Sequence, residues 1–174
     1  MKQLFFLLMF FRVFITYGQI ETAPTLKTIL PEQLKTTHTQ KDWFVPLNIA
    51  LEGLTPEQAM WKDSSGNHSI GQLPNHLIFW NQQQLAKFKG EQPASFSGNN
   101  NETFSNFDKN SWNATVTKAD SILTALEKAI EEADEAKLKS WYSIIAHISN
   151  IMLITQVKLF ISANYKARGI RKKE

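Results

Sequence analysis

Four histidines carry most of the side-chain chemistry in this chain of 174 residues, which contains no cysteine. Structural disulfides, thiolate-bound zinc and cysteine nucleophiles are therefore excluded. His76 lies in the apolar segment L-P-N-H-L-I-F-W and His147 in I-I-A-H-I, so we expect both on the inward faces of helices. For each, two interpretations stay open: a core histidine that is hydrogen-bonded within the protein, or a ligand of a metal ion.

The other polar residues have simpler structural interpretations. We expect His38 and His68 to be solvated. The segment S-G-N-H-S-I-G at 65–71 lacks the G-x-S-x-G spacing of a nucleophile elbow. No inward carboxylate pair with E-x-x-H spacing occurs, which argues against a di-iron bundle. An acidic run is predicted to be a solvated face with lysine neighbours; it contains Glu127, Glu131, Glu132 and Glu135.

The elements that must position His76 and His147 are predicted to be helices. Residues 31–51 are predicted to form one helix with a kink at Pro46, and residues 56–61 a short helix capped by Thr55. Ser69 is expected to cap a long helix over residues 70–89. An apolar stripe with four- and three-residue spacing predicts a third long helix over 112–133, and a polar connection at 134–139 leads to a fourth that starts near Ser140.

These elements predict an all-α fold, because no strand-like alternation competes with them. The leading architecture is an up-and-down four-helix bundle with a long loop between its second and third helices. That loop covers residues 91–110, is rich in Asn, Ser and Gly, and contains three phenylalanines as apolar anchors. We expect it to cross one end of the bundle.

Residues 1–18 have the pattern of a secretory signal peptide, with Lys2 before an apolar stretch and small residues before a cleavage site near Gln19. An uncleaved anchor is the alternative, although the stretch is short and Arg12 interrupts it. The remaining chain divides into a helical bundle at 19–165 and a basic disordered tail at 166–174. We expect an exported protein, periplasmic or secreted, with no stable transmembrane segment after cleavage.

The net charge of +3 arises at the two ends of the chain. Residues 19–165 carry 12 basic and 15 acidic side chains, so the predicted bundle is slightly acidic. A nucleic-acid-binding domain requires Lys and Arg on one folded face, and we therefore expect no nucleic-acid partner.

Several segments of the sequence resemble the DinB-like family of helical bundles. The matching text is D-W-F-V-P-L at 42–47, G-L-T-P-E-Q-A at 53–59, N-H-L-I-F-W at 75–80, the loop at 98–107 and I-A-H-I at 145–148. The resemblance implies a four-helix bundle in which one histidine of the second helix and two of the fourth, spaced H-x-x-x-H, hold a divalent metal such as zinc, nickel or iron. His76 matches the first of these ligands. Some relatives hydrolyse amides or transfer low-molecular-weight thiols, so the resemblance also implies a small-molecule substrate.

The fourth helix departs from the family pattern after Ser149. Ile151 and Thr155 stand where the family has its i, i+4 histidine pair, so one of the three implied ligands is retained and we expect no stoichiometric metal. Codons allowed for residues 150 onward, read in a shifted frame, can encode HNAYHTGQIIYIRKLQGSWD, which is similar to the family's ending. We interpret Ile151 to Glu174 as the product of a single-base deletion near codon 150, in the gene or in its sequencing.

Two functions follow from these observations. The first is an exported DinB-like metal-binding protein, of unassigned reaction, whose metal site is defective in this chain. The alternative is a non-catalytic envelope bundle in which His76 only satisfies the core. The apolar residues at 151–161 broaden the hydrophobic stripe of the fourth helix, which leaves a homodimer open.

Overall fold

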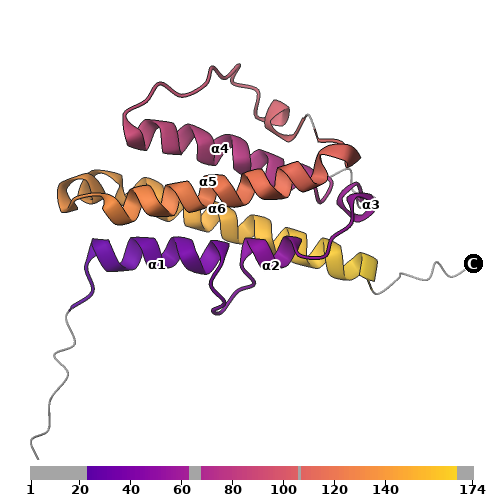
Figure 1. The fold of residues 1–174 in the computed structure, drawn as a ribbon, viewed down its shortest axis with the longest axis horizontal. Helices are drawn as coiled ribbons and strands as arrows, with labels where there is room; N and C mark the ends of the chain where they lie inside the picture. Colours follow the sequence, from indigo (N-terminus) through magenta and orange to yellow (C-terminus); the bar gives the residue numbers. More distant parts are fainter. Residues whose placement is uncertain (1–22, 63–67, 106, 168–174) are drawn as a thin grey trace, which may run out of the picture.

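The computed structural model describes residues 23–62, 68–105 and 107–167, and its regular elements are helices (Figure 1). Four long helices dominate: α1 (Leu26–His38), α4 (Gln72–Lys89), α5 (Trp112–Glu132) and α6 (Glu135–Ala167). Two short helices, α2 (Leu47–Leu51) and α3 (Pro56–Ala59), and two 3-10 helices, η1 (Asn100–Phe104) and η2 (Lys109–Ser111), lie in the connections. The described residues contain no strand, and the predicted all-α bundle is confirmed.

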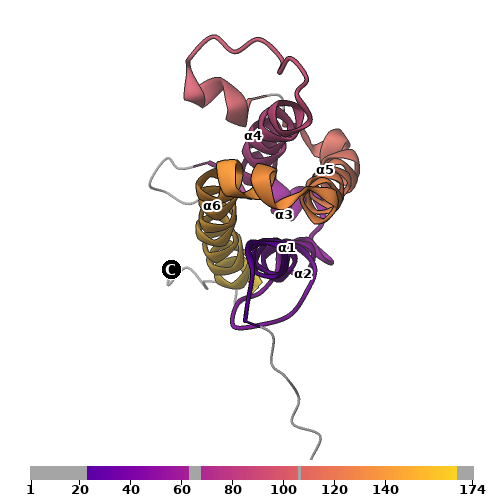
Figure 2. The same ribbon diagram turned by 90° about the vertical axis from the view of Figure 1, so that its left-hand side faces the viewer.

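The four long helices surround one apolar core. Viewed along the bundle, α1 and α4 lie at opposite corners and α5 and α6 fill the two corners between them (Figure 2). Each long helix contributes side chains that are almost completely buried, and removing this apolar surface from water is the main stabilising term. These side chains include Leu34 of α1, Leu77 of α4, Leu126 and Ile130 of α5, and Ile145 and Met152 of α6.

The predicted long loop is present, but it follows a different path. It runs back along α4 instead of crossing one end of the bundle (Figure 1). Consequently α4 and α5 run in the same direction, α1 and α6 run in the opposite one, and the directions do not alternate as in the predicted up-and-down order. Two side chains of α4 hold the loop in place. The Gln83 amide donates to the Ala94 carbonyl (2.9 Å), and the Asn75 amide donates to the Ser105 carbonyl (2.6 Å).

The single helix predicted over residues 31–51 is wrong, because two helices cover this region. α1 begins at Leu26, where the backbone N–H of Thr25 donates to the Thr28 hydroxyl (2.9 Å), and it ends at His38. α2 begins only at Leu47, with Pro46 in extended conformation at its N-cap. A proline disfavours helical conformation in the residue before it, so α2 does not extend back beyond Pro46. Instead of a kink, residues 39–46 separate the two helices.

The other helix boundaries lie closer to the predictions. Thr55 caps α3 as expected, and its hydroxyl accepts from the Gln58 N–H (3.2 Å). α4 begins two residues after the predicted start, and the hydroxyl of Ser69 accepts from the N–H of its first residue, Gln72 (3.3 Å). α6 begins at Glu135, earlier than Ser140, because the Asp134 carboxylate accepts from a backbone N–H in the first turn.

Two predicted segments fall wholly or mainly outside the described residues. These are the signal peptide at 1–18 and the basic tail at 166–174, of which the structure describes only the first two residues, at the end of α6. Within the described part of the chain, no helix combines the length and the apolar character that a membrane span requires.

Candidate functional site

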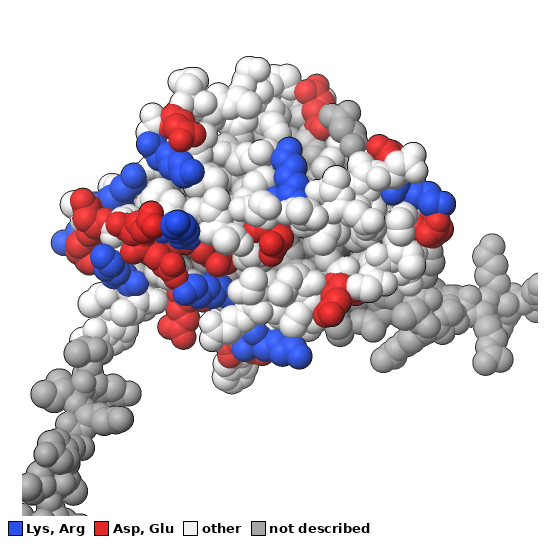
Figure 3. Space-filling view, in the orientation of Figure 1, with Lys and Arg blue, Asp and Glu red and all other residues white. Residues whose placement is uncertain are grey.

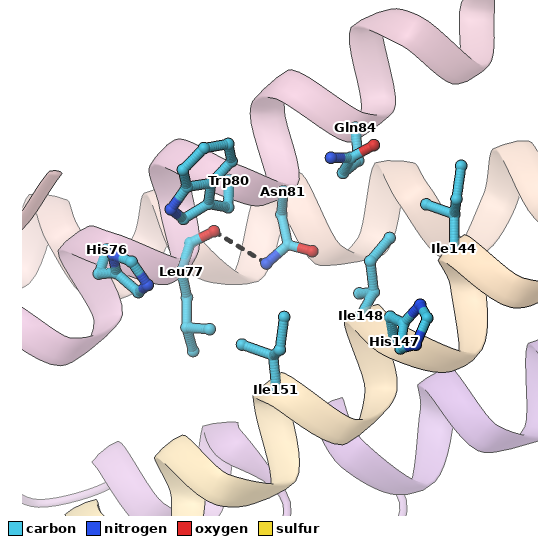
Figure 4. Close-up of a pocket in the computed structure, with 9 residues that line it drawn as sticks. All are labelled: His76, Leu77, Trp80, Asn81, Gln84, Ile144, His147, Ile148 and Ile151. Atoms are coloured by element: carbon cyan, nitrogen blue, oxygen red, sulfur yellow. Dashed lines mark hydrogen bonds between the residues drawn. The ribbon is translucent and has the colours of Figure 1, made fainter. Parts of the chain in front are cut away.

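A pocket of about 260 Å³ lies between α4 and α6 (Figure 4). Both histidines that the sequence marks as candidates contribute to it, one from each helix. The accessible part of its wall is mainly apolar, and no Asp, Glu, Lys or Arg side chain lines it. The lining residues are His76, Leu77, Trp80, Asn81 and Gln84 from α4, and Ile144, His147, Ile148 and Ile151 from α6.

The long loop orients His76 at this pocket. The Nδ1 atom of His76 lies 2.5 Å from the Thr103 hydroxyl, which itself donates to the Asn100 carbonyl (2.6 Å). The hydroxyl has a single proton and uses it toward Asn100, so it accepts from His76. Nδ1 therefore carries the proton, and in the neutral ring Nε2 carries the lone pair. A histidine that binds a metal through one ring nitrogen typically donates a hydrogen bond of this kind from the other.

Aromatic stacking also holds the ring of His76 in place. The ring of Phe104 stacks on the ring of His76, with 4.0 Å between centroids, and also on the ring of His68, with 3.5 Å between centroids. The prediction that His68 is solvated is therefore wrong, since the residue is half-buried against the loop.

The inward face of α6 differs in part from the predicted one. Ile145 and Ile148 are buried as expected, but Ile144 is 38% exposed and His147 is exposed on the rim of the pocket. Ile151 follows His147 by one turn and is 50% exposed. Consequently one stripe of α6 faces the core, while the neighbouring stripe lines the open side of the pocket.

The residues present do not fit the metal centre that the family resemblance implies. Ile151 lines the same pocket as His76, and Thr155, one turn further along α6, is buried with its hydroxyl donating to the Ile151 carbonyl (2.9 Å). Neither side chain offers an imidazole nitrogen. No group of three His, Cys, Asp or Glu residues in the described ranges is placed to hold a metal ion. Among the described residues, no two further ligands are therefore placed to complete a coordination geometry with His76.

A second polar cluster joins α1 to α5. His38 is only 1% exposed, with Nδ1 at 2.7 Å from Glu127 Oε1 and Nε2 at 3.0 Å from Asp120 Oδ1. The predictions that His38 is solvated and that Glu127 belongs to a solvated face are both wrong. His38 follows buried Leu34 by one turn. Glu127 and Glu131 both face α1, but the Glu127 side chain is only 12% exposed, whereas that of Glu131 is 41% exposed.

Two residues of the site escaped the sequence analysis. Asn81 is 4% exposed and Thr103 is 6% exposed, although both are polar. Asn81 follows Leu77 by four residues and Ile78 by three, and this helical spacing is a signal that places it on the inward face. No local pattern marks Thr103, because its position depends on how the loop folds over α4.

Charged side chains of both signs gather where α5 connects to α6, and the middle of the visible face is largely uncharged (Figure 3). Lys35 of α1 pairs with Glu131 of α5 in this charged region. The hydrogen bond to Glu131 raises the pKa of Lys35 above its usual 10.5. This face has no broad surface of one sign.

The comparisons with known proteins agree with this architecture. A family model described as the DinB superfamily matches residues 46–142, from the start of α2 into the first turns of α6. No curated protein and no solved structure matched the chain. The matched segment contains His76 and the long loop that orients it, and it covers more than half of the 174 residues. The chain thus belongs to the DinB superfamily.

Proposed function

We propose that the pocket between α4 and α6 is the place of a divalent-metal centre of the DinB type, and that this centre is incomplete in the present sequence. One observation carries the proposal: His76 of α4 and Ile151 of α6 line the same pocket. The position at which the resemblance implies a second ligand therefore belongs to the same pocket as His76.

The surroundings of His76 support a former or latent ligand role. The hydrogen bond from Nδ1 to Thr103 leaves the lone pair of the neutral ring on Nε2, which is the protonation state that a metal ligand requires. Histidines at positions 151 and 155 would follow each other by one helical turn, the spacing that lets two imidazoles reach one ion. Zinc, nickel and iron all accept imidazole ligands.

The reaction of an intact centre belongs to the class that the resemblance implies, metal-dependent hydrolysis or thiol transfer on a small molecule. With only one of the three implied imidazole ligands, we propose that the present chain holds no ion in a defined geometry and performs neither reaction. We propose that the tail following Asn150 is the reason, and that it results from a single-base deletion in the gene or in its sequencing.

Elemental analysis of the purified protein tests this proposal. We expect much less than one equivalent of metal in the unmodified chain and about one equivalent in the double variant Ile151→His/Thr155→His or in the frame-restored protein. When His76→Ala is introduced into the double variant or the frame-restored protein, that equivalent of metal should be lost. The double variant Lys128→His/Glu132→His is the control, since it forms an i, i+4 pair on an exposed face of α5 that does not line the pocket, so any metal that it binds should not depend on His76.

Two results would contradict the proposal. One is a double variant that folds and gains no metal. The other is a tightly held equivalent of zinc, nickel or iron in the unmodified protein, with a ligand bond to His76.

A second candidate function, a non-catalytic envelope bundle, is favoured by the contacts of His76 itself. The ring both donates to Thr103 and stacks on Phe104, so it fastens the long loop to α4 without any ligand. Metal content that stays the same after frame restoration would favour this function. In either case we propose export with cleavage near Gln19, which N-terminal sequencing of the protein from its native source would test.

A further inference from the structure

Asn81 has a buried oxygen atom with no hydrogen-bond partner. Its Oδ1 is the only such side-chain atom found among the described residues, and the residue as a whole is 4% exposed. Buried polar atoms are nearly always paired in folded proteins, so an unpaired acceptor requires an explanation. The pocket between α4 and α6 provides one, because Asn81 is part of its wall.

The orientation of the Asn81 amide follows from its other hydrogen bond. Its Nδ2 donates to the Leu77 carbonyl at 2.8 Å, and a carbonyl oxygen can only accept. The amide nitrogen must therefore face Leu77, which directs the oxygen away from α4's own backbone. Figure 4 shows this oxygen pointing toward α6, on the side of Ile148 and Ile144.

The pocket around this oxygen is suited to a neutral and largely apolar molecule. No Asp, Glu, Lys or Arg side chain lines it, so a charged organic molecule would enter without a carboxylate, ammonium or guanidinium partner. The Trp80 N–H already donates to Asn100 (3.2 Å), which leaves the indole ring for apolar contact. The volume of about 260 Å³ exceeds the roughly 150 Å³ of an engineered cavity that binds benzene in another protein.

We propose that this pocket binds a neutral small molecule of one or two rings that donates a single hydrogen bond, from an O–H or N–H group, to Asn81 Oδ1. Leu77, Trp80 and Ile148 supply the apolar contacts, and Asn81 favours molecules that carry a hydrogen-bond donor over those that do not. This inference goes beyond the metal centre and does not depend on it, because the unmodified chain already has every residue that it uses.

A pair of matched probes, indole and indene, tests the selectivity. The two molecules have the same ring skeleton, but only indole has an N–H donor. Their dissociation constants for the full protein are measured by NMR titration of the backbone and Asn81 amide signals, with a chelator present so that metal has no influence. We expect indole to bind about tenfold more tightly than indene.

Three variants assign the effect to the pocket. Asn81→Leu should abolish the preference and leave indole and indene with equal affinities. Ile151→Trp narrows the mouth at a residue that is 50% exposed, so the fold is retained and both probes should bind at least about tenfold more weakly. Ile29→Trp is the matched control, since Ile29 is 39% exposed on α1 and does not line the pocket.

The outcomes separate this inference from its alternatives. Equal affinities of the two probes for the unmodified protein, or no saturable binding of either, would mean that no ligand donor pairs with Asn81 Oδ1 and would overturn the proposal. A preference for indole that persists in Asn81→Leu would overturn the role of Asn81. Failure of the metal experiment leaves all of these measurements unaffected.

Discussion

The Nδ1 atom of His76 on α4 lies 2.5 Å from the hydroxyl of Thr103 in the long loop. The loop is thus a positioning element, because it determines which nitrogen of His76 carries the proton and which carries the lone pair.

Removing the Thr103 hydroxyl should change the proton distribution of His76. In Thr103→Val the acceptor is lost, and we expect the imidazole to become a mixture of tautomers and the free energy of unfolding to fall by about 1–3 kcal/mol. Nitrogen chemical shifts of the ring report the tautomer, and urea unfolding reports the stability. Thr103→Ser keeps a hydroxyl and should retain the single tautomer; the same mixture in both variants would show that Thr103 does not orient the ring.

The two carboxylates at His38 should contribute unequally to stability. The Glu127 side chain is 12% exposed, whereas that of Asp120 is 60% exposed. A largely buried hydrogen bond to a charged group contributes more than an exposed ion pair, which solvent screens. We expect Glu127→Ala to lower the free energy of unfolding by about 1–3 kcal/mol, and Asp120→Ala by less than about 1 kcal/mol. Urea titrations of the two variants give the comparison, and equal losses would contradict it.

Gly71, which precedes α4, should not tolerate a larger residue. Its φ is −75°, so no unusual backbone conformation is involved, but a Cβ atom there would overlap the ring of Phe107. We expect Gly71→Ala to destabilise the protein by about 1–3 kcal/mol through overpacking. Phe107→Leu should partly rescue Gly71→Ala, so the losses in the double-variant cycle should not add. Thermal unfolding of the single and double variants measures this coupling, and additive losses would contradict the contact.

The ion pair between Glu57 of α3 and Lys109 of η2 should make a small, pH-dependent contribution to the stability of the fold. The hydrogen bond from Lys109 lowers the pKa of Glu57 from its usual 4.5. A carboxylate with a lowered pKa stabilises the fold fully above its unfolded value and loses this effect as the pH falls through its folded value.

Glu57→Gln should therefore have a slightly lower urea midpoint than the unmodified protein at neutral pH, and the difference should vanish in acid. The side chains of both partners are more than half exposed, so the effect is small. Lys109→Met removes the same pair and should give the same profile. A difference that grows on acidification would show that the pair does not act through the Glu57 carboxylate.

Local sequence signals predicted the features that depend on residues close together in the chain. Thr55 and Gln58 predicted the start of α3, and the stripe from Trp112 to Ile130 predicted the buried face of α5, because capping and helical periodicity are local effects. The candidate His76 was found in the same way, from the apolar residues around it.

The tertiary structure determined what depends on residues far apart in the sequence. Thr103 meets His76 only because the loop folds back along α4, and His38 is buried only because α5 brings Glu127 and Asp120 to it. The unpaired oxygen of Asn81 likewise faces a pocket only because α6 packs opposite α4. The sequence by itself therefore specified most of the helices and the family. The packing of the helices against one another decided which polar atoms are paired, because hydrogen bonds depend on distance and not on order along the chain.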